Sequence, residues 1–200
     1  ALASGAFADV EGAWERLTPF MLAGDAAGET AVRELAAAHN LGRPLANLYL
    51  LRAQQPEAPA DAARDWMHAA RIYERDLGEP REALEAALRA LALDMNNREL
   101  LGEVDRMAVT TSSWERLSRV YSKLIEQAHE RDTKAELLLR HAEILERGAA
   151  DPASALECVL KVCKLVPERD DLLKRAETLA IAAGSHGELV VIYEKLAANA

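Results

Sequence analysis

The sequence predicts an all-α fold, an α-α superhelix or solenoid of antiparallel helix hairpins with about eleven helices. Three observations predict it. Strong helix formers such as alanine, leucine, glutamate and arginine dominate the 200 residues, whereas aromatic residues contribute only 4%. The chain also matches itself over a long span. Finally, helix-capping and helix-ending residues recur at intervals that suit a series of short helices.

The self-match has an offset of 72 residues, since 142 − 70 = 72. The segment 70–85 lies over the segment 142–157 without a gap, and further along Tyr121 falls on Tyr193. One offset earlier the match is weaker but persists, with Tyr49 aligned to Tyr121. A repeat of this length corresponds to two helical hairpins of roughly 36 residues each.

Local signals place the helices in order along the chain. Asp151 is a capping residue, and it precedes Pro152 at the first helical position, where the missing N–H of proline costs nothing. The capping-box pairs are Ser112 with Glu115, Thr133 with Glu136 and Ser185 with Glu188. The helix-ending glycines are Gly24, Gly78, Gly148 and Gly184. The expected helices are 11–23, 27–40, 43–55, 60–76, 80–93, 97–110, 113–129, 133–147, 152–165, 169–183 and 186–198.

One loop interrupts the series at residues 54–60, which read Gln-Gln-Pro-Glu-Ala-Pro-Ala. It separates diverged N-terminal helical repeats at 1–56 from two units of two hairpins each, at 57–128 and 129–200. Because hairpin stacking can continue across such a loop, we interpret the loop as a kink within one continuous solenoid.

The residues inside each unit resemble the tetratricopeptide repeat (TPR), a helix hairpin with small residues where its two helices cross. Ala70 and Ala142 occupy the small position of the first helix, and Ala83 and Ala155 occupy the small position that opens the second helix. Small side chains there let the two helix axes approach closely. The large positions of the first helix are Tyr73 and Leu145, and the closing proline is Pro167.

The second hairpin of each unit departs from this pattern. Leu117 and Leu189 stand where the TPR has a small residue, and Met95 stands where Pro167 closes the later unit. These copies resemble the half-TPR and related TPR-like variants. The alternation of two hairpin types is similar to that of long bacterial repeat proteins. The resemblance covers residues 60–200 well and implies a non-catalytic fold that binds proteins.

The charge of the chain argues against nucleic acid as a partner. Its formal net charge is −9 and its pI is about 5.1, and it carries no basic stripe. The two cysteines, Cys158 and Cys163, point in different directions on a helix and are expected to be ordinary core residues. No apolar stretch approaches the roughly 18 residues that a membrane-spanning helix needs, so we expect a soluble, cytoplasmic protein. Because the chain starts at Ala1, we expect a processed or excised piece.

Motifs of catalysis, metal binding and cofactor binding are missing from the sequence. It contains no glycine-rich phosphate loop, no His-Glu-x-x-His and no Cys-x-x-Cys. His68 and His141 fall at nearly equivalent places of successive units and are expected to be structural. The three tryptophans, Trp14, Trp66 and Trp114, are expected in the core with one edge at the surface. We therefore expect no enzyme activity, no metal and no cofactor.

The TPR resemblance implies a binding surface on the concave wall, which the first helix of each hairpin lines. Its candidate groove positions in the earlier stretch are basic or mixed: Arg64, Arg71, Glu74, Arg75, Arg98 and Asp105. The later positions are mainly acidic: Glu136, Glu143, Glu146, Arg147, Asp170 and Glu177. A groove graded in charge in this way would set the direction of an extended peptide or partner helix. The alternative is that these side chains are ordinary solvated surface charges.

A second candidate surface lies near residue 190. Val190 and Val191 align with Ser118 and Arg119 of the earlier unit, so the later helix is the more apolar of the two. A terminal repeat normally carries a polar outer face. The two valines therefore predict either further repeats in the full protein or a contact with another molecule, such as a second copy of the chain.

These observations favour a protein–protein interaction scaffold or adaptor that binds a peptide or partner helix in its concave groove. An alternative is a helical regulatory domain of a larger enzyme or assembly. A third hypothesis is RNA binding, because some helical-repeat solenoids read bases, but the acidic composition argues against it.

Overall fold

The computed structural model describes residues 2–55, 59–167 and 171–185, together with residues 187, 190, 191, 193 and 194. These residues form ten α-helices and no strand. The helices are α1 (Leu2–Leu22), α2 (Ala26–His39), α3 (Gly42–Ala53), α4 (Pro59–Arg75), α5 (Pro80–Leu93), α6 (Arg98–Thr110), α7 (Trp114–Gln127), α8 (Arg131–Arg147), α9 (Pro152–Leu165) and α10 (Asp171–Ala183). The expected helix at 186–198 lies largely outside the described residues.

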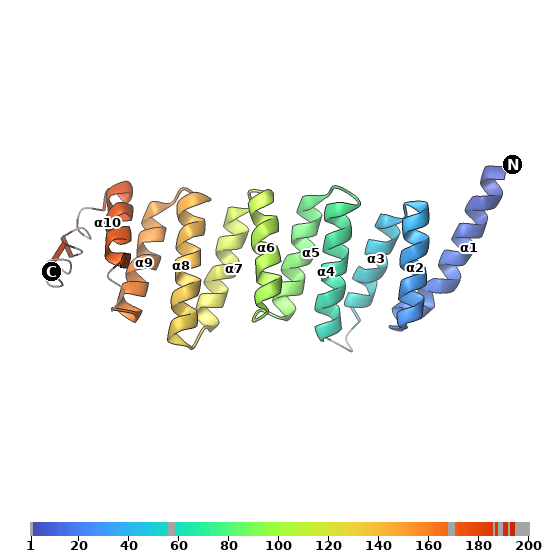
Figure 1. Ribbon diagram of the computed structural model, residues 1–200, viewed down its shortest axis with the longest axis horizontal. Helices are drawn as coiled ribbons and strands as arrows, with labels where there is room; N and C mark the ends of the chain where they lie inside the picture. Colours follow the sequence, from blue (N-terminus) through green and yellow to red (C-terminus); the bar gives the residue numbers. More distant parts are fainter. Residues whose placement is uncertain are drawn as a thin grey trace. The chain divides into compact units, whose positions relative to one another are not determined.

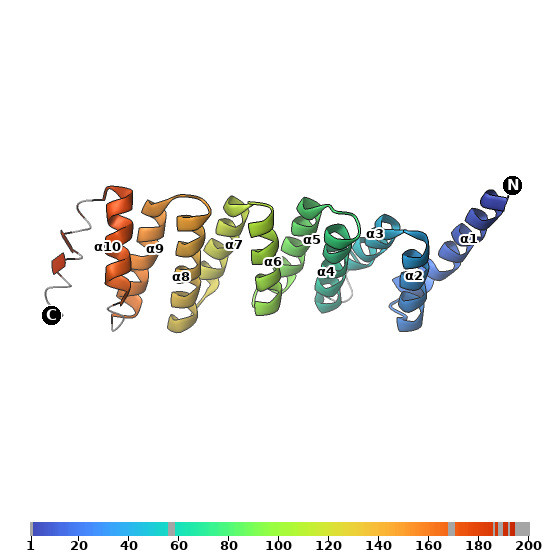
Figure 2. The same ribbon diagram turned by 45° about the horizontal axis from the view of Figure 1, so that its top comes forward.

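The chain forms two compact units, Ala1–Met107 and Ala108–Ala200. In the first unit α1 packs on α2 and α3, α2 packs on α3, α3 on α4, and α4 on α5. In the second unit α7 packs on α8, α8 on α9, and α9 on α10. Figures 1 and 2 show that consecutive helices within each unit lie side by side. Such packing of each helix on its successor is typical of an α-α superhelix of helix hairpins.

The helix boundaries repeat at the 72-residue offset read from the sequence. Helix α4 starts at Pro59 and α8 at Arg131, and α5 starts at Pro80 and α9 at Pro152. The helices of each pair are also equal in length, at 17 residues for α4 and α8 and 14 residues for α5 and α9. The same hairpin is therefore built twice, once in each unit.

Equivalent positions of the two hairpins have the same surroundings. Ala70 and Ala142 are both 0% exposed, and so are Ala83 and Ala155. A side chain larger than alanine at these points would force the two helix axes apart. Together with the packing order, these matched small positions show a repeated helix-hairpin fold, as the sequence predicts.

Two expected helix starts are wrong. The first helix begins at Leu2 rather than near residue 11, because the alanine-rich start of the chain also favours helix. Helix α8 begins at Arg131 after the N-cap residue Glu130, so Thr133 lies inside the helix and cannot cap it. Asp151 does cap α9 as expected, since its side chain accepts a 3.0 Å hydrogen bond from the Ser154 amide.

Among the other expected helix-capping and helix-ending residues, the glycines are confirmed and the serine capping box is not. Ser112 has a positive φ of 53°, and Ser113 takes the N-cap position of α7 without a capping hydrogen bond from its side chain, so the Ser112–Glu115 capping box is wrong. The hydroxyl of Ser113 instead accepts a 2.9 Å hydrogen bond from Thr111. Gly24, Gly78 and Gly184 end helices with positive φ. Glu188, the partner expected for Ser185, lies outside the described residues.

Candidate functional site

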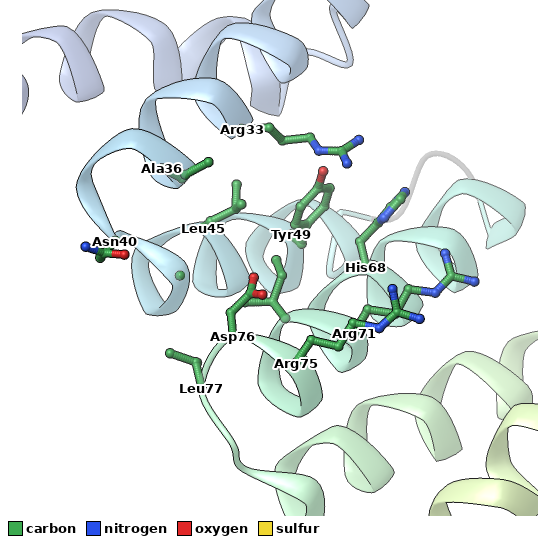
Figure 3. A pocket seen from close by; sticks show the side chains of 13 residues that line it. Arg33, Ala36, Asn40, Leu45, Tyr49, His68, Arg71, Arg75, Asp76 and Leu77 are labelled. Atoms are coloured by element: carbon green, nitrogen blue, oxygen red, sulfur yellow. The ribbon is translucent and has the colours of Figure 1, made fainter.

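The first unit contains a pocket of about 690 Å³ bordered by α2, α3, α4 and the residues that follow α4 (Figure 3). We call it the arginine pocket. Its lining residues are Arg33, Ala36, Ala37, Asn40, Gly42, Leu45, Tyr49, His68, Arg71, Ile72, Arg75, Asp76 and Leu77. In the view of Figure 3 the four basic side chains gather toward one end of the pocket, whereas Ala36, Leu45 and Leu77 lie toward the other.

The basic end consists of exposed arginines. Arg33 comes from α2, and Arg71 and Arg75 come from successive turns of α4, which places the latter two on one helix face. None of the three guanidinium groups forms an ion pair or a hydrogen bond within the part of the chain that the structure describes. Asp76 is the one carboxylate among the described lining residues. The pocket therefore carries a positive charge in a chain whose net charge is −9.

A buried ion-pair network lies beside the arginine pocket and joins four helices. The Arg52 side chain donates two 2.6 Å hydrogen bonds to the two carboxylate oxygens of Asp65. Its Nη1 atom donates to Oε2 of Glu29 at 2.9 Å and to the backbone oxygen of Met21 at 3.0 Å. Asp65 is 1% exposed and Arg52 is 9% exposed. Two-point pairing of this kind satisfies both buried charges and holds α1, α2, α3 and α4 in a defined register.

Tyr49 connects this network to the wall of the arginine pocket. Its hydroxyl donates a 2.9 Å hydrogen bond to Oε1 of Glu29, and the Arg52 guanidinium lies 5.3 Å from the ring centroid. The His68 imidazole stacks on the same ring at a centroid distance of 4.8 Å. Burial and the hydrogen bond to Glu29 raise the pKa of Tyr49, so the phenol remains protonated. Tyr49 thus holds His68 in place at the basic end.

The positive charge of the pocket comes from its arginines rather than from His68. Burial lowers the pKa of His68, the Glu29 carboxylate counteracts part of this effect, and nearby Arg33 and Arg71 lower the pKa further. The imidazole is therefore neutral at neutral pH and offers one donor and one acceptor nitrogen.

Sequence reasoning missed most of this site. Arg71 and Arg75 were among the expected groove residues, but Arg33, Tyr49 and His68 were not. The network residues Glu29, Arg52 and Asp65 were missed as well. A signal for Arg52 and Asp65 exists in the sequence, because each is a charged residue set among the apolar positions of a helix, where only a paired charge is tolerated.

The remaining expected groove positions of the first unit are not part of the pocket. Arg64 is exposed and pairs with Asp61 at 3.2 Å. Both carboxylate oxygens of Glu74 accept hydrogen bonds from Arg106, at 2.6 and 2.8 Å. Arg98 is exposed, whereas Asp105 is only 9% exposed and does not present a charge to solvent as the groove hypothesis expects.

The expected groove positions of the second unit that the structure describes lie on α8 and α10. Glu143 accepts a 2.9 Å hydrogen bond from Arg140, and Glu146 pairs with Arg175 at 3.2 Å. Glu177 accepts a 2.8 Å hydrogen bond from the Tyr193 hydroxyl. The other members are Glu136 and Arg147, which are exposed, and Asp170, which lies outside the described residues. Val190 and Val191 are 58% and 52% exposed.

His141 of the second unit is a buried counterpart of His68, and it stacks on Tyr121 as His68 stacks on Tyr49. Its Nε2 atom is 2.8 Å from the Ser118 hydroxyl, and its Nδ1 atom is 3.8 Å from the Cys158 sulfur. Burial raises the pKa of Cys158, which keeps the thiol protonated and unreactive. No group of three or more His, Cys, Asp or Glu residues that could hold a metal occurs in the described ranges. Nor does any helix found there have the length and apolar character to cross a membrane.

No protein-family model matches the chain, and no curated protein matches it. Eight chains of solved structures match. One is from a crystal structure of a Podosopora anserina protein described as a kinesin light chain with nearly identical TPR-like repeats; it is 12% identical in sequence and has a TM-score of 0.47. That match covers 95% of this chain and 93% of the other.

Proposed function

We propose that the chain is a non-catalytic protein–protein interaction scaffold or adaptor that binds a peptide or partner helix along the first helices of its hairpins. In this proposal the arginine pocket holds an acidic part of the partner. The observation that supports it is a set of three arginines that form no ion pair or hydrogen bond among the described residues, around a pocket with an apolar end. Helical-repeat folds of this class commonly bind other proteins through such extended surfaces.

The chemistry of the pocket fits a protein segment. Exposed guanidinium groups donate paired hydrogen bonds to carboxylates or phosphates, which is how arginine clusters recognise acidic motifs. The apolar end, with Ala36, Leu45 and Leu77, suits a neighbouring aliphatic or aromatic side chain of the same segment. An acidic residue next to an apolar residue is therefore the simplest ligand.

We further propose that the first-helix positions of the second unit contribute to partner binding. Glu136, Glu143, Glu146 and Glu177 are acidic, with Arg147 and Asp170 nearby in sequence, so they would favour a basic part of the same partner. Reversal of Glu143 and Glu146 to lysine should then weaken binding of such a partner. An unchanged affinity of this variant would show that Glu143 and Glu146 do not belong to the binding surface.

A peptide-binding experiment tests the function of the arginine pocket. The double variant Arg71→Glu with Arg75→Glu should lower the affinity for acidic peptides selected on the wild-type chain by about tenfold or more, because two charge-assisted contacts become repulsive. Fluorescence anisotropy with labelled peptides measures the affinity. The matched control is Arg81→Glu, which reverses an exposed charge on α5, outside the pocket and outside the expected groove. Equal losses in both proteins, or no loss in either, would contradict the proposal.

A further inference from the structure

Three acidic residues close to the arginine pocket, Glu29, Asp65 and Glu74, are hydrogen-bonded to partners other than its arginines. Glu29 lies one helical turn before Arg33, where a carboxylate would ordinarily pair with the arginine, but its two oxygens accept hydrogen bonds from Tyr49 and Arg52. Both oxygens of Asp65 are bound by Arg52. These two carboxylates therefore do not form ion pairs with the pocket arginines.

The same holds for Glu74, which directly precedes Arg75 in α4. Both of its oxygens accept hydrogen bonds from Arg106, so Glu74 forms no ion pair with Arg71 or Arg75, although its charge still attracts that of Arg75. These three acids are thus hydrogen-bonded to other partners, and none of the three pocket arginines forms an ion pair or a hydrogen bond among the described residues. Such an arrangement keeps a positive site open for a ligand rather than closing it with internal ion pairs.

The charge of the pocket fits a dianion. Three arginines and one aspartate line it, which gives 3 − 1 = +2 with His68 neutral. A phosphoryl group carries about −1.5 to −2 at neutral pH, whereas a carboxylate carries a single negative charge. The arginines also come from two helices, and three acceptor oxygens in a tetrahedral group can be approached by guanidinium groups from different sides.

We propose, on the basis of the function proposed above, that the basic end of the arginine pocket is a phosphate subsite that recognises a phosphorylated side chain of the protein partner. Arg33, Arg71 and Arg75 bind the phosphoryl oxygens, and the apolar end receives the side chain of an adjacent residue. A nucleic acid fits less well, because a polyanion needs a series of basic contacts and is repelled by the acidic remainder of the chain.

The test uses the full chain and three matched libraries of short peptides with random flanking residues. The central residue is phosphoserine in the first library, serine in the second and glutamate in the third. The wild-type chain should bind phosphoserine peptides at least about tenfold more tightly than serine or glutamate peptides. Arg33→Gln and Arg71→Gln should each remove most of that preference. Arg81→Gln, at an exposed arginine of α5 outside the pocket and outside the expected groove, should retain it.

The outcomes separate this inference from the proposed function. Equal binding of the phosphoserine and glutamate libraries, with both weakened by Arg71→Gln, would overturn the phosphate subsite and leave an acidic-peptide pocket. Binding that neither pocket variant changes would overturn both proposals. If inorganic phosphate bound but phosphoserine peptides did not, or if an RNA oligonucleotide bound more tightly than the phosphoserine peptides, a phosphorylated protein partner would be excluded.

Discussion

At the scale of single residues, the first unit depends on how its buried charges are paired. Arg52 alone contacts Asp65, Glu29, the Met21 backbone and the Tyr49 ring. Its five N–H donors permit this, whereas lysine could not reproduce the planar two-point contact with Asp65. The network stabilises the helices that carry the arginine pocket. Because Arg52 binds Glu29 and Asp65, these two carboxylates do not form ion pairs with the pocket arginines.

Arg52→Met should destabilise the protein strongly. The substitution keeps an apolar stem but leaves Asp65 as a buried charge without its guanidinium, which costs about 3–5 kcal/mol. Urea unfolding followed by circular dichroism measures the free energy of unfolding. The double variant Arg52→Met with Asp65→Leu should recover much of the loss, because it removes both charges together. A loss below about 1 kcal/mol for the single variant would show that the ion pair does not hold the helices.

His141 should make stability depend on pH. Burial and the positive charge of Lys161 lower the pKa of this imidazole in the folded protein below its ordinary value near 6.5. As the pH falls through about 6.5, the unfolded chain binds a proton that the folded chain does not, so this contribution to stability is complete above that pH and decreases below it.

His141→Gln should therefore show a smaller decrease in the free energy of unfolding between about pH 7.5 and pH 5.5 than the wild type does. Urea unfolding at several pH values measures the difference. Part of the decrease should persist, because burial also lowers the pKa of His68. His129→Gln, at an exposed position, is the control and should follow the wild type. Identical slopes for wild type and His141→Gln would refute the assignment.

At the scale of helices, the ends are determined partly by packing. Gly148 follows α8 with a negative φ of −97°, so it does not serve as a left-handed end residue. A Cβ atom at this position would instead overlap the Trp114 ring at the start of α7. Gly148 does end α8, as the sequence predicts, and it also makes room for the half-buried Trp114 indole.

Substitution of two glycines by alanine should have opposite effects. Gly148→Ala should destabilise the protein by about 1–3 kcal/mol, because the new methyl group overlaps the Cγ, Cδ2 and Cε3 atoms of the Trp114 ring. Gly102→Ala should stabilise it by about 0.5–1 kcal/mol, because Gly102 lies inside α6 with open space around the added Cβ. Thermal and urea unfolding compare the two variants. Equal effects of both substitutions would rule out the indole contact.

At the scale of the whole molecule, the two units repeat one hairpin but differ in their surface chemistry. The first unit carries the arginine pocket, and the second carries mainly acidic first-helix positions that are individually paired or exposed. A histidine stacked on a tyrosine is present in both, half-buried at His68 and buried at His141, and the first of these pairs lines the arginine pocket. A repeat fold can thus keep its buried pattern while its surface positions diverge.

The exposed valines of the second unit should promote self-association. Val190 and Val191 are more than half exposed, and burial against a second copy would contribute roughly 1.5–3 kcal/mol for each side chain. Val190→Ser with Val191→Arg should lower the apparent mass of the chain at high concentration, as measured by size-exclusion chromatography with light scattering. An unchanged mass and solubility would exclude a self-association surface at these residues.

The sequence by itself determined the helices, their pairing into hairpins and the small buried positions Ala70, Ala83, Ala142 and Ala155. Each of these features depends on local helix propensity and on a spacing that repeats along the chain. The site was different, because its charge depends on which acids and bases meet between helices. Only the tertiary structure decided that Glu29, Asp65 and Glu74 bind arginines outside the pocket. It also decided that Arg33, Arg71 and Arg75 form no ion pair among the described residues.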